Sequence, residues 1–123
     1  MVIFDTNAIL RYILRDNPAM SAEVKNQLLT GEVCFIPVEV IAEIVYVLSK
    51  VYGIERDVIA TTVTNISRVS NISIAQKDVV LHALRVYAVT TLDFVDCLLI
   101  GYAKEEHYTV FTFDKKIRKF LNE

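Results

Sequence analysis

Val2-Ile3-Phe4, followed at once by Asp5-Thr6-Asn7, is the stretch that decides the fold. The three apolar residues show no alternation with polar ones, and they stop at residues that favour turns and helix starts. A short continuous apolar run of this kind is typical of a parallel strand that is buried on both faces. The sequence therefore predicts an α/β protein whose first strand delivers Asp5 to one rim of a central sheet.

The rest of the chain continues this alternation of strands and helices. We expect strands at residues 33–36, 72–75 and 109–112, and helices at residues 8–14, 21–29, 38–51, 56–69, 77–87 and 93–106, with a basic amphipathic tail after Asp114. Ser21 is the expected N-cap of the second helix. The third helix should bury a stripe formed by Ile41, Ile44, Val45 and Leu48. This order predicts an α/β sandwich with a mostly parallel sheet covered by helices on both faces.

Composition excludes several classes of protein. The chain has 123 residues, enough for a single domain spanning 1–123, and its 54% hydrophobic content excludes disorder. No apolar run is long enough to span a bilayer, so no membrane role is expected. The mean hydropathy of +0.40 indicates a covered apolar face, and a homodimer is the expected arrangement. A net charge of −2 excludes a strongly basic nucleic-acid coat.

The cysteines and histidines indicate a cellular compartment and argue against a zinc site. Cys34 and Cys97 form no CxxC pair, and no signal peptide precedes them, so we expect buried free thiols in a reducing cytoplasm. The chain has two histidines, which makes a His/Cys zinc site an unfavourable interpretation.

Four acidic residues stand at positions that suggest chemistry. Asp5 follows the first strand and Asp114 follows the last, so both should project at the same rim of the sheet. Glu43 and Asp96 are embedded in apolar helical stretches, where a buried carboxylate needs a cation, a metal or hydrogen bonds. Asp93 lies one helical turn before Asp96, on the same face.

These motifs resemble the PIN-domain nucleases over essentially the whole chain. The resemblance is carried by Asp5-Thr6-Asn7, the lone Glu43, Asp93-Phe94-Val95-Asp96 and Thr112-Phe113-Asp114 in that order. The start, with Leu10-Arg11-Tyr12 and Leu14-Arg15-Asp16, is similar to the VapC-like toxin ribonucleases of toxin–antitoxin pairs. The resemblance to PIN domains implies a PIN-like three-layer α/β/α sandwich. Gly101 departs from the alanine that relatives prefer, and we expect it to let a neighbouring helix approach closely.

The resemblance also implies a site and partners. Asp5, Glu43, Asp96 and Asp114 match the catalytic carboxylates that hold Mg²⁺ or Mn²⁺, and Asp93, Thr112 and Asn7 match supporting positions. Hard oxygen ligands suit these two ions, and metal-assisted hydrolysis of a phosphodiester needs no histidine or serine. The implied partners are an RNA substrate and a cognate antitoxin protein. A basic rim could contact the RNA backbone, formed by Arg11, Arg15, Lys104, Lys115, Lys116, Arg118 and Lys119.

Other interpretations stay open. Asp5 and Asp114 could simply cap helices, Asp93 could be an N-cap, and Glu43 could be a solvated helix residue like Glu39. A non-catalytic interaction module with the PIN fold is the main alternative function. A response-regulator receiver would need an acidic neighbour beside Asp5, and a haloacid-dehalogenase-type phosphatase would need Asp-x-Asp, so neither matches.

Overall fold

A parallel sheet of three short strands forms the centre of the fold. The computed structural model describes all residues from 1 to 123. Strands β1 (Val2–Ile3), β2 (Cys34–Ile36) and β3 (Ile72–Ile74) pair in the order β1-β2-β3, with Cys34 opposite both Val2 and Ile72. The sequence prediction of parallel strands is confirmed here.

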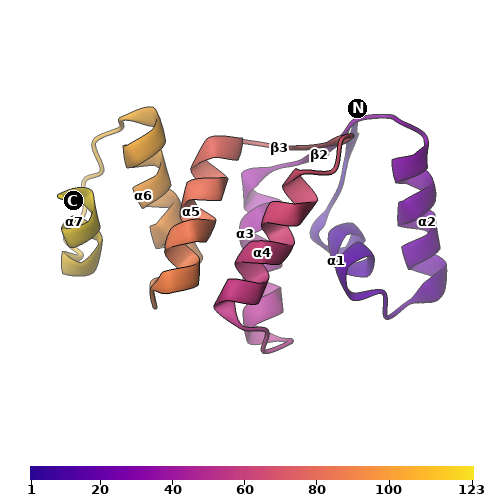
Figure 1. The fold of residues 1–123 in the computed structure, drawn as a ribbon, viewed down its shortest axis with the longest axis horizontal. Helices are drawn as coiled ribbons and strands as arrows, with labels where there is room; N and C mark the ends of the chain where they lie inside the picture. Colours follow the sequence, from indigo (N-terminus) through magenta and orange to yellow (C-terminus); the bar gives the residue numbers. More distant parts are fainter.

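Helices surround the sheet and account for most of the chain. They are α1 (Thr6–Leu14), α2 (Pro18–Leu29), α3 (Val38–Lys50), α4 (Arg56–Ser67), α5 (Lys77–Val89), α6 (Phe94–Glu106) and α7 (Lys115–Leu121). Figure 1 shows α1 and α2 on the side of the N-terminus, α3 and α4 in the middle, and α5, α6 and α7 toward the C-terminus. The fold is therefore α/β, as the alternation of elements predicted.

The start of α2 corrects one prediction. The helix begins at Pro18, and the side chain of Asn17 caps it by accepting a hydrogen bond from the backbone N–H of Met20 at 3.1 Å. Ser21, the predicted cap, lies inside the helix and is buried. Proline is well suited to the first helical position because its missing N–H has no partner there anyway, so the helix can start three residues earlier than expected.

The predicted core stripe of α3 is confirmed, since Ile41, Ile44, Val45 and Leu48 are all about 1% exposed. The close approach expected at Gly101 is also confirmed. A β-carbon built at Gly101 in α6 would lie 2.6 Å from the backbone oxygen of Val79 in α5. The two helices thus pack backbone against backbone at this point.

Residues 109–112 form no strand, so that prediction is wrong for this structure. The chain turns at His107, which has a φ of 60°, and has no regular secondary structure from there to α7. Thr112 makes its hydrogen bonds locally: its oxygen accepts from Arg118 Nε at 2.7 Å, and its hydroxyl accepts from the N–H of Asp114 at 3.0 Å. The outer edge of β1 has no pairing strand, and Ile3 is 67% exposed.

Both cysteines are buried and unpaired, as predicted. None of the helices has the length and apolar character needed to cross a membrane.

Candidate functional site

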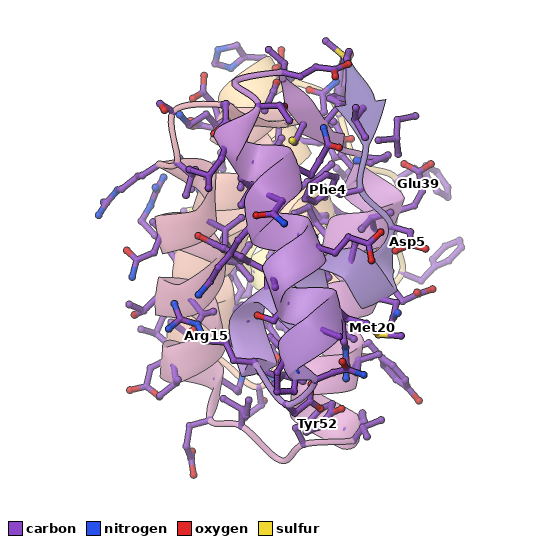
Figure 2. All side chains as sticks on the ribbon, turned by 90° about the vertical axis from the view of Figure 1, so that its right-hand side faces the viewer. Phe4, Asp5, Arg15, Met20, Glu39 and Tyr52 are labelled. Atoms are coloured by element: carbon purple, nitrogen blue, oxygen red, sulfur yellow. The ribbon has the colours of Figure 1, made fainter.

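Asp5 stands directly after β1 and begins α1. Its Oδ1 atom accepts a hydrogen bond from the N–H of Ala8 at 2.8 Å, so the capping interpretation is confirmed for this residue. The carboxylate remains exposed, and its second oxygen takes no part in the cap. Figure 2 shows Asp5 on the same side of the view as Met20 and Glu39, opposite Arg15. Asp5 also lines a shallow pocket that includes Asn7.

A cleft of about 410 Å³ lies between α3 and the start of α6. Its lining includes Asp93 and Asp96 from the start of α6, together with Ala42 and Tyr46 from α3. Glu43 is exposed and lies between these two α3 residues in sequence, one helical turn before Tyr46. The helix therefore places Glu43 at the border of the cleft that contains Asp96.

Asp96 has an unusual electrostatic environment. Burial raises its pKa above the ordinary value for aspartate, and the negative charges of Asp93 and Asp114 raise it further. Burial disfavours the charged form of a carboxyl, and nearby like charges do the same. No hydrogen bond or ion pair stabilises the carboxylate of Asp93, although Asp93 occupies the N-cap position of α6. Three acidic residues thus lie in one region, and none of them forms an ion pair.

Asp114 lies close enough for its charge to act on Asp96. It caps α7, where its Oδ1 accepts from the N–H groups of Lys116 at 2.8 Å and Ile117 at 3.1 Å. The capping interpretation is therefore also confirmed for Asp114. Thr112 holds the turn before it by accepting from its N–H. The second carboxylate oxygen of Asp114 stays outside these bonds.

The four acidic residues do not converge in this structure as the sequence analysis expected. No group of three or more His, Cys, Asp or Glu side chains is arranged to hold a metal ion. The last apolar run was predicted to be a strand that brings Asp114 to the rim of the sheet, but it bonds locally before α7 instead. The charge of Asp114 acts on Asp96, Glu43 borders the cleft that Asp96 lines, and Asp5 follows β1 and lines a different pocket.

Several residues of the predicted basic rim already have partners. Arg11 forms an ion pair with Asp16 at 2.6 Å, and Lys104 donates to the backbone oxygen of Glu123 at 2.6 Å. Lys115, Lys116 and Lys119 are exposed and make no ion pair. The exposed lysines next to Asp114 are therefore the cations most available to a polyanion.

Sequence reasoning missed two residues of the cleft. Tyr46 is 62% exposed and lines the cleft. Arg56 also lines the cleft, and its partners are backbone carbonyls 31 and 36 residues away. Helical periodicity places Tyr46 outside the buried stripe of α3, which was a usable signal. No sequence pattern indicates that the side chain of Arg56 bonds to backbone carbonyls so far along the chain.

The parallel sheet and the acidic region at the start of α6 define an α/β protein with a carboxylate-rich cleft. Comparison with protein families identifies the class: the PIN domain matches residues 2–121. The chain belongs to the PIN domain family. PIN domains are generally nucleases and typically bind divalent metal ions. Searches of curated proteins and of solved structures found no significant match.

Proposed function

We propose that this protein is a divalent-metal-dependent ribonuclease that hydrolyses RNA phosphodiester bonds. The observation that carries the proposal is the setting of Asp96 in a chain of the PIN family: it is a half-buried carboxyl whose pKa is raised first by burial and then by the charges of Asp93 and Asp114. Structures seldom bring like charges together without a function, because their repulsion disfavours the folded state. A cation bound at this place would relieve that repulsion.

The residues present fit Mg²⁺ or Mn²⁺ by their chemistry. All candidate ligands are carboxylate oxygens, which these hard cations prefer, and neither cysteine lies exposed among them. Asp96 and Asp114 would hold the ion, with Glu43 and Asp5 completing the set and Asp93, Thr112 and Asn7 in support. When bound, a divalent ion supplies positive charge to the phosphate and activates a water for attack.

Completion of the site requires the segment after α6 to approach β1. Two properties favour this movement: the outer edge of β1 is unpaired, and Phe111 and Phe113 are 87% and 80% exposed. Burying one phenylalanine side chain stabilises a fold by about 2 kcal/mol. Spin labels at Ile3→Cys and Phe111→Cys measure the approach by pulsed electron resonance. We expect the distance between the labels to shorten on addition of Mg²⁺, and an unchanged distance would contradict this step.

The exposed lysines beside the acidic residues bind the RNA substrate. Lys115 and Lys116 directly follow Asp114, so they can neutralise the phosphates that flank the scissile bond. Such contacts release counterions, and binding should therefore weaken as the salt concentration rises. The VapC-like start of the chain supports a role as the toxin of a type II toxin–antitoxin pair, as a cytoplasmic homodimer bound by its antitoxin protein.

The proposal is tested by RNA cleavage. Purified protein with Mg²⁺ or Mn²⁺ should cut single-stranded RNA, and chelation of the metal should stop the reaction. Asp96→Asn should lower the rate at least about a hundredfold, because several kcal/mol of transition-state stabilisation are removed. Asp78→Asn is the matched control, since Asp78 also lies in the first turn of a helix but far along the chain from the cleft. Equal activity of the two variants would refute the assignment.

One observation favours a second candidate. Asp5 lines a different pocket from Asp93 and Asp96, and no three ligands are arranged together, as expected for a non-catalytic module with the PIN fold. Such a module would bind no divalent ion, and Asp96→Asn would leave its interactions unchanged.

A further inference from the structure

Arg56, the first residue of α4, joins three parts of the chain beside Asp93 and Asp96. Its Nε atom donates a hydrogen bond to the backbone oxygen of Tyr87 at 2.8 Å, and its Nη2 atom donates to the backbone oxygen of Leu92. The guanidinium carbon also lies 3.7 Å from the centre of the Tyr87 ring. A single side chain thus links α4, the last turn of α5 and the residue just before Asp93.

The chemistry of these contacts is specific to arginine. The last carbonyls of a helix lack partners within the helix and carry its partial negative charge. The oxygen of Tyr87 is one of these, and its neighbour Val86 is satisfied by the hydroxyl of Thr90 at 2.8 Å. The planar guanidinium can reach two carbonyls while it stacks on an aromatic ring, which a lysine ammonium cannot do.

The connection that Arg56 holds is the one that presents the acidic residues. Residues 90–93 link α5 to α6, and the oxygen of Leu92 is fixed both by Arg56 and by the Sγ atom of Cys97 at 3.9 Å. Asp93 makes no capping hydrogen bond of its own, so its own helix does not anchor its side chain. Arg56 lines the same cleft as Asp93 and Asp96.

We infer that Arg56 is a positioning residue: it fixes the α5–α6 connection so that Asp93 and Asp96 are held ready for a divalent cation. This inference rests on the proposed metal-dependent function. Without the guanidinium, the connection would gain freedom and the mutual repulsion of the carboxylates would spread them. Binding of the cation would then have to order the α5–α6 connection, which Arg56 holds in place before the cation binds.

Calorimetric titration with MnCl₂ tests the inference on the full chain without measuring activity. Arg56→Gln should raise the Kd for Mn²⁺ about tenfold, the usual effect of losing a residue that orients metal ligands. Arg56→Lys should show a smaller rise, because the charge stays but the paired hydrogen bonds are lost. Tyr87→Leu keeps both carbonyl acceptors and removes only the ring. It provides a second variant with an intact guanidinium, and its Kd should rise less than that of Arg56→Gln.

Asn71→Ala is the matched control for a purely structural role. The Nδ2 atom of Asn71 also ties down a carbonyl in the last turn of a helix, that of Leu28 at 2.7 Å, remote in sequence from the acidic residues. This variant should lose thermal stability but keep the wild-type Kd for Mn²⁺.

The possible outcomes distinguish the positioning role of Arg56 from the proposed metal-dependent function. Wild-type affinity in Arg56→Gln and Arg56→Lys, or an equal loss of affinity in Asn71→Ala, would overturn the positioning role alone. If the wild-type protein itself bound no Mn²⁺, the proposed function would fall, and the positioning role would fall with it.

Discussion

Gly101→Ala adds one methyl group at the closest approach between α5 and α6. The new β-carbon would lie 2.6 Å from the oxygen of Val79, 3.2 Å from its Cγ1 atom and 3.4 Å from its carbonyl carbon. An ordinary carbon–oxygen contact is about 3.3 Å or longer, so the helices must separate by roughly 0.7 Å along this line. The obstructing atom belongs to a helix backbone and cannot rotate away.

Two opposing effects determine how much Gly101→Ala changes the free energy of unfolding. Alanine favours a helix over glycine by about 1 kcal/mol, which would stabilise the variant. Overpacking of a well-packed core destabilises by about 1–3 kcal/mol, and the upper end applies because a backbone must move. We therefore expect a net loss of about 2 kcal/mol in the free energy of unfolding. For a chain of this length, that loss corresponds to a fall in Tm of roughly 6–10 °C.

Urea unfolding followed by circular dichroism measures this change. Val79→Ala combined with Gly101→Ala is the control: it removes the Cγ1 contact but leaves the carbonyl, so it should not restore stability. Ala103→Gly gauges the propensity effect in the same helix. A Gly101→Ala variant as stable as the wild type, or more stable, would refute the close approach, and rescue by the double variant would assign the obstruction to the side chain.

Two further predictions follow from the acidic and thiol groups. The pKa of Asp96 is raised in the folded state above its usual 3.8. Protonation of Asp96 therefore adds to the free energy of unfolding in full below pH 3.8, and this contribution is lost as the pH rises through the raised pKa. Without divalent metal, Asp96→Asn should therefore stabilise the protein at pH 7 by on the order of 0.5 kcal/mol, and equal Tm values in EDTA would contradict this. Burial raises the pKa of Cys97 to about 11, so roughly one thiol in ten thousand is ionised at pH 7. Iodoacetamide should leave native Cys97 unmodified while it labels the urea-unfolded chain, and rapid labelling of the native protein would be the contrary result.

Patterns local in the sequence predicted most of the fold. The stripe from Ile41 to Leu48 follows from the periodicity of a buried helix face and is confirmed. The apolar run of Val2–Ile3 forms a parallel strand as predicted, but its burial on both faces was wrong, because β1 is an edge strand and Ile3 is 67% exposed. The start of α2 was misplaced because two capping signals compete, and Asn17 with Pro18 provides the stronger one.

Long-range pairing could not be predicted from the same patterns. Residues 109–112 have the composition of a strand, but a strand also needs a partner edge, and here Thr112 bonds to Arg118 and Asp114 instead. The candidate site, too, could be predicted only in part from local patterns. An acidic residue inside an apolar run drew attention to Asp96, and its half-buried setting fits that interpretation. Asp5 and Asp96 line different pockets, and this placement depends on long-range packing that no local pattern encodes.

Binding of Mn²⁺ observed by electron paramagnetic resonance tests the carboxylate site most directly, because free Mn²⁺ gives a sharp signal that is lost on binding. Wild-type protein should deplete the free signal at stoichiometric concentration, and Asp96→Asn should deplete it far less, whereas Asp78→Asn should match the wild type. A free Mn²⁺ signal that wild-type protein leaves undiminished, or that Asp96→Asn depletes as fully as the wild type, would contradict a metal site built on Asp96.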